Sequence, residues 1–323
     1  GGSEALVGEA IRGRTDLDEP IVVVTKGHAY TPEDFHRELG ISREKLGVTG
    51  AGELYIGSNR IVLVYLLHGI NEERWNTITS SGVLESVQRA KADGAINFIG
   101  FSSHYAQKPQ IKAAMETGVF DVVELPYNLF NRELGEDGET DFLALAHSLD
   151  MGIINMKAFS GNGFVQIYRI LRDYVSIDYA GMLRFCLANS HVSTIDAGAK
   201  YVSEFQADMD VAQLDTLDAA AVAEMKKEAD SVAPVMKNIC RECMHCTEKF
   251  ECPQGVDFPG ILSTYSRFLV GTRMGVDTRE QQEAYQRFEK NAEDCIECAE
   301  CLPWCEYKLN IPEMLQEAHA QLG

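Results

Sequence analysis

Two cysteine-rich runs constrain what this chain can fold into more than any other feature of its sequence. They span Cys240–Cys252 and Cys295–Cys305 and contain eight of the nine cysteines. In each run three cysteines recur at i, i+3 and i+6, and a fourth follows at a distance. Three thiolates at this spacing can hold three corners of a [4Fe–4S] cubane. The spacing therefore predicts two [4Fe–4S] clusters.

In two-cluster proteins with this spacing, the fourth cysteine of each run usually binds the other cluster. That rule assigns one cluster to Cys240, Cys243, Cys246 and Cys305, and the second to Cys295, Cys298, Cys301 and Cys252. The sequence departs from the usual pattern in two places. Five residues precede Cys252 where about three are usual, and Glu306 follows Cys305 where a proline is usual.

Structural zinc and disulfides are alternatives for the same cysteines. Zinc sites prefer separated Cys-x2-Cys pairs that close one four-ligand tetrahedron, which would leave the third cysteine of each triplet unused. Disulfides need an oxidising compartment, and the start of the chain shows no apolar signal region. The ninth cysteine, Cys186, lies in an apolar helical stretch and is interpreted as a small core residue.

Composition and charge exclude several classes of partner. The 323 residues are 45% hydrophobic, which is enough for a large core. No apolar run reaches the roughly 18 residues that span a bilayer. A formal net charge of −20 works against binding a polyanion. The sequence therefore predicts a soluble, cytoplasmic protein that binds neither membrane nor nucleic acid.

The first 200 residues alternate short β-branched runs with helical patterns, as in βαβ units on a parallel sheet. Six buried strands are predicted at Ile21–Thr25, Ile61–Leu67, Ile96–Phe101, Val122–Leu125, Gly152–Met156 and Val192–Asp196. A closed (β/α)8 barrel needs eight. The glycine-rich stretch from Gly40 to Asn59 gives no readable pattern. Residues 1–232 are predicted as the barrel domain and residues 233–323 as the cysteine domain, with Pro234 at the boundary and a helical insertion from Phe258 to Asp294.

Two polar residues come directly after predicted strands. Lys26 follows the first strand and His68 follows the second. In parallel barrels the reactive groups lie where strands end, although such a residue is often only the first solvated position of a loop. The pair would suit carbonyl reduction, in which the histidine donates a hydrogen bond to the substrate oxygen and the lysine tunes a neighbouring acid by its charge.

At these positions the chain resembles the aldo-keto reductases, specifically the type with a C-terminal ferredoxin-like domain that holds two clusters. The matching segments are Gly2–Glu4, Leu6–Ala10, Val24–Lys26, Leu66–His68, Trp75, Gly82–Glu85, Ile99–His104, Pro126–Asn128 and Asn155–Lys157. The resemblance implies an Asp-Tyr-Lys-His tetrad, in which Lys26 is similar to the lysine and His68 to the histidine. It also implies that NADPH delivers hydride while the tyrosine protonates a carbonyl.

The family motif places its Asp and Tyr just ahead of a Gly-x-Ser-Glu signature, and here that signature begins at Gly1. The same upstream segment would supply the first two barrel strands. The expected fold is therefore a TIM barrel without its first two strands, joined to a helix-rich ferredoxin-like domain. A piece of a longer gene product and a natural shortened paralogue without reductase activity are both compatible with this pattern.

The resemblance further implies cofactor contacts. Ser102, Ser103 and Glu124 fall where the family binds the nicotinamide amide, although asparagine is usual in place of Ser103 and glutamine in place of Glu124. Met156 falls where many members stack a tyrosine on the nicotinamide. Gly198 and Lys200 fall near the adenosine 2′-phosphate site, but the arginine expected a few residues later is not evident, so both NADP and NAD are candidates.

These expectations combine into an oxidoreductase that links NAD(P)H-dependent carbonyl or alcohol chemistry to electron transfer through two clusters. A small carbonyl or alcohol is the expected substrate, and an electron-transfer protein is a candidate partner. A flavin is a further candidate cofactor, because hydride carries two electrons and a cluster ordinarily takes one. The alternative hypothesis is a catalytically inactive barrel scaffold that carries an iron–sulfur electron-carrier or docking module.

Overall fold

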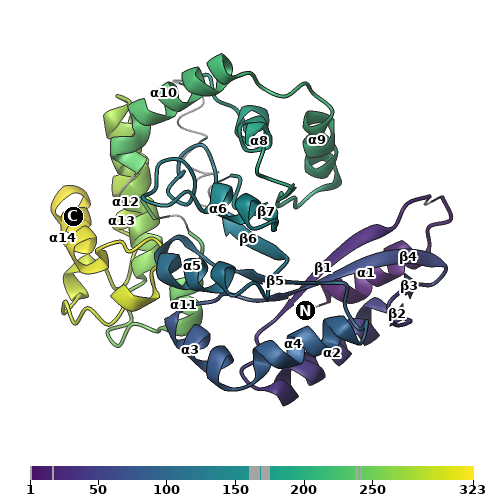
Figure 1. The fold of residues 1–323 in the computed structure, drawn as a ribbon. Helices are drawn as coiled ribbons and strands as arrows, with labels where there is room; N and C mark the ends of the chain where they lie inside the picture. Colours follow the sequence, from purple (N-terminus) through teal and green to yellow (C-terminus); the bar gives the residue numbers. More distant parts are fainter. Residues whose placement is uncertain (1, 17, 160–167, 169–174, 237–238, 241) are drawn as a thin grey trace. The chain divides into compact units, whose positions relative to one another are not determined.

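Parallel strands form the sheet that carries the first candidate site (Figure 1). The computed structural model describes residues 1–323 except 1, 17, 160–167, 169–174, 237–238 and 241. The strands found at the predicted places are β1 (Ile21–Gly27), β4 (Asn59–Leu67), β5 (Phe98–Ser102), β6 (Val122–Pro126), β7 (Gly152–Met156) and β8 (Thr194–Asp196). β1 pairs with β4, and the order continues through β5, β6, β7 and β8. The pairs β1–β4, β4–β5 and β5–β6 are parallel, as predicted.

The unpredicted stretch from Gly40 to Asn59 forms the end of a helix and an antiparallel hairpin. β2 (Val48–Thr49) pairs with β3 (Leu54–Ile56), and β3 pairs with the start of β4. Only two residues connect Ile56 to its partner Asn59, and the first of them, Gly57, has φ 62°. Two-residue hairpin turns require such left-handed conformations, which glycine adopts without strain.

The helices in the first half of the chain precede or connect the strands, and some of them begin with a side chain that caps the first turn. They are α1 (Ser3–Arg12), α2 (Pro32–Leu46), α3 (Glu72–Ser80), α4 (Val83–Ala92), α5 (Lys108–Glu116) and α6 (Phe142–Ser148). In α2 the Thr31 hydroxyl accepts a hydrogen bond from the Asp34 amide, Pro32 occupies the first turn, and Gly47 closes the helix at φ 73°. Thr31 and Pro32 thus stabilise the N-terminal end of α2, and Gly47 stabilises its C-terminal end.

The first strand differs from its prediction as a buried strand. Val22 is 61% exposed and Val24 is 39% exposed, whereas Val23 and Thr25 are buried. This alternation shows that one face of β1 is uncovered, because successive side chains of a strand point to opposite faces. Among the described residues β4 is also the one strand that pairs with β1. Its neighbours on the sheet are better covered, since Val64, Leu66, Val122 and Ile154 form an apolar cluster.

The described residues group into two compact units. The first contains Gly1–Pro126, Leu134–Ile154 and His191–Thr194, and the second contains Tyr127–Glu133, Asn155–Ser190 and Ile195–Gly323. Helices of the second unit are α8 (Tyr179–Ala188), α9 (Val202–Ala212), α10 (Ala219–Met236), α11 (His245–Lys249), α12 (Phe258–Arg273), α13 (Arg279–Tyr285) and α14 (Ile311–Leu322). Pro234 lies inside α10, so the helix runs past the predicted boundary between residues 232 and 233.

Helices α12 and α14 build the core of the cysteine region. Phe258, Ile261, Leu262 and Tyr265 from α12 belong to one buried cluster. From α14 the cluster takes Ile311, Met314, Leu315, Ala318 and Leu322. Six of the eight clustered cysteines pack against or within this cluster, so the predicted iron–sulfur region has an apolar core of its own. No helix in the described parts of the chain combines the length and apolar character needed to cross a membrane.

Candidate functional sites

Lys26 is held by a carboxylate on the same face of the sheet. Its Nζ lies 2.6 Å from both carboxylate oxygens of Glu124, which stands on β6. Glu124 is 2% exposed, whereas the Lys26 side chain is 32% exposed. A buried carboxylate is costly unless a cation compensates it, and the ion pair with Lys26 offsets this cost for Glu124.

His68 belongs to a chain of three polar side chains that the sequence did not reveal. His68 Nδ1 lies 2.6 Å from His28 Nε2, and His28 Nδ1 lies 2.9 Å from Nη1 of Arg74. Arg74 stands in the first turn of α3 and is 2% exposed. Burial, followed by repulsion between a protonated His68 and the cationic forms of its neighbours His28, Lys26 and Arg74, lowers the pKa of His68 to about 3. The ring of His68 is therefore neutral at physiological pH.

Gly27, between Lys26 and His28, has no room for a side chain. A Cβ at this position would collide with the Tyr65 hydroxyl and approach a Glu38 carboxylate oxygen. The same Glu38 carboxylate accepts a hydrogen bond of 2.7 Å from the His28 amide. Because Gly27 has no side chain, Glu38 of α2 can come close enough to accept this hydrogen bond at the end of β1. Lys26, His28 and His68 also line one cavity of about 600 Å³, to which residues of β1, α1 and α2 contribute.

The predicted nicotinamide contacts Ser102 and Ser103 hold the loop after β4. The Ser102 hydroxyl accepts a hydrogen bond of 2.9 Å from the Gly69 amide, and the Ser103 hydroxyl donates one of 2.7 Å to the Ile70 carbonyl. Ser102 is also the register partner of Glu124 on the neighbouring strand. After these bonds the Ser102 hydroxyl can still act as a donor, and the Ser103 hydroxyl can still act as an acceptor.

The other predicted cofactor contacts belong to the second compact unit. Met156 ends β7 and is buried, whereas Gly198 and Lys200 are exposed ahead of α9. The Lys200 amide donates a hydrogen bond of 2.7 Å to Glu204, and its ammonium lies 5.6 Å from the centre of the Tyr201 ring. A role for these three residues in cofactor binding stays a prediction.

The eight clustered cysteines line two separate cavities, four in each. Cys240, Cys243, Cys246 and Cys305 line the first cavity. Cys252, Cys295, Cys298 and Cys301 line the second. These are the two sets that the crossed assignment names, and Phe258 and Ile311 contribute to the walls of both. The ninth cysteine, Cys186, is fully buried, as expected for a core residue.

The two cysteine runs share an unusual backbone conformation. Glu242 and Met244, on either side of Cys243, have φ values of 46° and 62°. Glu297 and Ala299, on either side of Cys298, have 55° and 61°. Such conformations cost a non-glycine residue of the order of 1–3 kcal/mol each and concentrate at ligand sites. Loops of this kind turn their N–H groups inward and form the concave sites that bind phosphates and iron–sulfur clusters.

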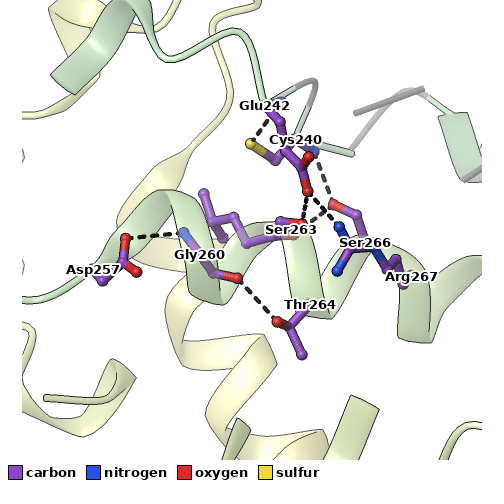
Figure 2. A network of polar contacts seen from close by, with 9 residues as sticks. Cys240, Glu242, Asp257, Gly260, Ser263, Thr264, Ser266 and Arg267 are labelled. Atoms are coloured by element: carbon purple, nitrogen blue, oxygen red, sulfur yellow. Dashed lines mark hydrogen bonds and ion pairs between the residues drawn. The ribbon is translucent and has the colours of Figure 1, made fainter. Parts of the chain in front are cut away.

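Helix α12 fixes the first of these loops through side chains (Figure 2). One carboxylate oxygen of Glu242 accepts hydrogen bonds from the Ser263 hydroxyl and, at 2.7 Å, from Arg267. The Ser266 hydroxyl accepts a hydrogen bond of 2.9 Å from the Cys240 amide. The Glu242 amide in turn lies 3.4 Å from the Cys240 sulfur. The strained loop is thus tied to a rigid element.

Burial and crowding of the thiols disfavour their ionisation in the two cysteine cavities. Burial, with the neighbouring thiols, raises the pKa of Cys240 to about 12 and those of Cys246 and Cys301 to about 11. Four thiols that share a cavity can all ionise only if a metal centre compensates their charge. Cys243, His245 and Glu306 also place three ligand atoms within 4.8 Å of one another, which leaves a single metal ion as an alternative.

Comparison with known proteins identifies the class of the first half of the chain. The sequence model of the Aldo/keto reductase family matches residues 1–176, and the chain therefore belongs to this family. The resemblance seen in the sequence is confirmed to that extent. Comparison with curated protein sequences finds no match.

Solved structures show the same fold at low sequence identity. The holo form of aldo-keto reductase AKR11C1 from Bacillus halodurans is 19% identical, with a TM-score of 0.54 over 69% of this chain and 76% of that chain. Its apo form gives a TM-score of 0.53 over the same shares at 19% identity. The thermostable aldo-keto reductase Tm1743, in complex with the inhibitor epalrestat, is 18% identical, with a TM-score of 0.51 over 70% and 77%. The fold is therefore a curled α/β sheet of the aldo-keto reductase type.

Proposed function

We propose that this protein is an oxidoreductase that joins NAD(P)H-linked carbonyl or alcohol chemistry to electron transfer through two [4Fe–4S] clusters. The grouping of the eight cysteines into two cavities of four, in a chain of the aldo/keto reductase family, carries the proposal. The crossed sets and the paired left-handed loops both support iron–sulfur ligation.

Each residue of the first site has a role in carbonyl chemistry. Bound NAD(P)H supplies hydride. The neutral ring of His68 donates a hydrogen bond to the carbonyl oxygen and so stabilises the negative charge that develops there. Lys26, fixed by Glu124, adds positive charge to the same face of the sheet. Ser102 and Ser103 have the donor and the acceptor that a nicotinamide amide needs.

The experiment is metal analysis of protein purified without oxygen. We expect about eight iron atoms and eight sulfides per chain, because each cluster contributes about four of each. About four would reduce the proposal to one cluster, and zinc without sulfide would replace it with a zinc site. Cys186→Ser is the matched control, because Cys186 lies in neither cavity and should leave the iron content unchanged.

A reduction experiment distinguishes an active oxidoreductase from an inactive scaffold that carries electrons. NADPH and dithionite are each added to the loaded protein while cluster absorbance and the paramagnetic signal are followed. Reduction by dithionite with no turnover of carbonyl substrates would support the inactive scaffold with an electron-carrier module. A response to NADPH that depends on an added flavin would identify the missing one-electron step. If neither reductant changes the signals, the clusters are structural.

A further inference from the structure

Arg74, His28 and His68 form a hydrogen-bonded chain whose donors and acceptors can be assigned. A guanidinium has only donors, so its Nη1, 2.9 Å from His28 Nδ1, makes that nitrogen the acceptor. A neutral imidazole then carries its single proton on Nε2. His28 Nε2 lies 2.6 Å from His68 Nδ1 and must donate to it. His68 in turn accepts at Nδ1 and keeps its own proton on Nε2.

Arg74 is well fixed for this role. Its second terminal nitrogen donates a hydrogen bond of 2.9 Å to the Gly27 carbonyl, which also accepts one of 2.9 Å from the His68 amide. The guanidinium lies 5.3 Å from the centre of the Tyr30 ring. Asn71 caps the helix by accepting a hydrogen bond of 2.8 Å from the Arg74 amide. A single buried arginine thus ties the ends of β1 and β4 to α3.

We propose that Arg74 and His28 are positioning residues that fix His68 in the tautomer with the proton on Nε2. This inference rests on the proposed function only for its purpose, which is to give a carbonyl oxygen a hydrogen-bond donor at all times. The relay needs the charged, donor-only side chain at position 74, because any neutral partner would leave the tautomer of His28 undetermined. This requirement also explains why the guanidinium of Arg74 is buried, although burying a charge costs free energy.

The test reads the tautomer of His68 directly, by nitrogen-15 NMR of the full chain with labelled histidine. His68→Gln assigns the signals of His68 among the eight histidines. In the wild type we expect Nδ1 to show the shift of an unprotonated nitrogen and Nε2 that of a protonated one. His28→Gln should preserve this pattern, because the glutamine amide is also a donor at the same reach.

His28→Glu is the decisive variant. A carboxylate can only accept, so His68 should take a proton on Nδ1 and its Nδ1 signal should shift to the range of a protonated nitrogen. His36→Glu on the exposed face of α2 is the matched control and should leave His68 unchanged. A wild-type His68 with its proton on Nδ1, or an identical spectrum in His28→Glu, would overturn the relay. Turnover is not needed, so this result stands apart from failure of the proposed reductase activity.

Discussion

At the residue scale, burial decides the charge of His68 and makes a pH prediction possible. The pKa of His68 falls from 6.5 to about 3 on folding. Between these values the unfolded state binds more protons than the folded state, so acid favours unfolding. The stability contributed by the neutral ring is complete above pH 6.5 and is lost as the pH falls toward 3.

Urea unfolding from pH 7.5 down to pH 5 measures this effect. The wild type should lose free energy of unfolding with decreasing pH more steeply than His68→Gln. The difference should stay below about 1.4 kcal/mol per pH unit, the limit for one proton, because the ring is partly exposed. The control His36→Gln removes an exposed histidine and should keep the wild-type slope. Equal slopes in all three proteins would show that folding does not shift the pKa of His68.

The Lys26–Glu124 pair gives a second prediction at the residue scale. Lys26→Met leaves the buried carboxylate without its cation and should cost about 2–3 kcal/mol, somewhat less than a fully buried pair because the lysine is partly solvated. Glu124→Gln should cost less, since the lysine can turn toward solvent. The double variant Lys26→Met/Glu124→Gln should recover part of the loss.

Denaturant unfolding of the two single variants and the double variant gives the coupling energy between them. Lys91→Met is the comparison, because Lys91 lies 2.6 Å from Asp121 in a pair where both side chains are more exposed. It should cost about 1 kcal/mol or less. A smaller loss for Lys26→Met than for Lys91→Met would contradict the buried-pair argument.

At the element scale, α12 supports one cysteine run and leaves the corresponding residue of the other exposed. Glu242 is bound by Ser263 and Arg267, whereas Glu297, at the same place in the second run, is exposed. If iron is bound as proposed, removing this support should weaken the first site selectively. A charged hydrogen bond is worth about 1.5–3 kcal/mol, so the loss of iron should accelerate roughly tenfold or more.

The measurement is the release of iron to a chelator from Ser263→Ala/Arg267→Gln. About half of the iron should leave faster than in the wild type, with the other half unchanged. Glu297→Gln is the matched control and should release iron at the wild-type rate. Uniform acceleration of all the iron would mean that α12 stabilises the whole domain instead of one loop.

The sequence predicted the regular elements well and the local exceptions poorly. β-branched runs follow from burial in a sheet, so six strands were found close to their observed bounds. The hairpin at Val48–Ile56 depends on the conformation of turn glycines and leaves no periodic signal. His28 could have been suspected, since it lies two residues after Lys26 and therefore on the same side of an extended chain. Arg74 could not, because its contact arises from tertiary packing.

The cysteine spacing predicted which thiols would lie together, but it does not identify the metal that they bind. The structure places each set of four in one cavity, but the ligands and the metal stay a prediction. The support from α12 could not be predicted, because Ser263, Ser266 and Arg267 are ordinary residues of a helix until their partners are known.

At the scale of the whole molecule, the open edge of β1 is the feature with the largest consequence. An unpaired edge presents backbone N–H and C=O groups that can pair with another chain. Here the edge is also apolar, since Val22 and Val24 are exposed beside it. A net charge of −20 opposes close approach, but salt screens this repulsion over distances of about 10 Å. We therefore expect this chain to associate through β1, and to do so more strongly in salt.

Sedimentation velocity at several protein and salt concentrations tests this expectation. The average mass should rise with both, and Val22→Lys/Val24→Lys should suppress the rise, because charged side chains on an edge strand disfavour pairing with a second chain. Leu149→Lys and Leu214→Lys, combined, are the control, since they add the same two charges at exposed apolar positions outside any strand. Suppression by both pairs would mean that net charge alone governs association. A wild-type chain that stays monomeric under all conditions would show that the edge of β1 is protected in solution.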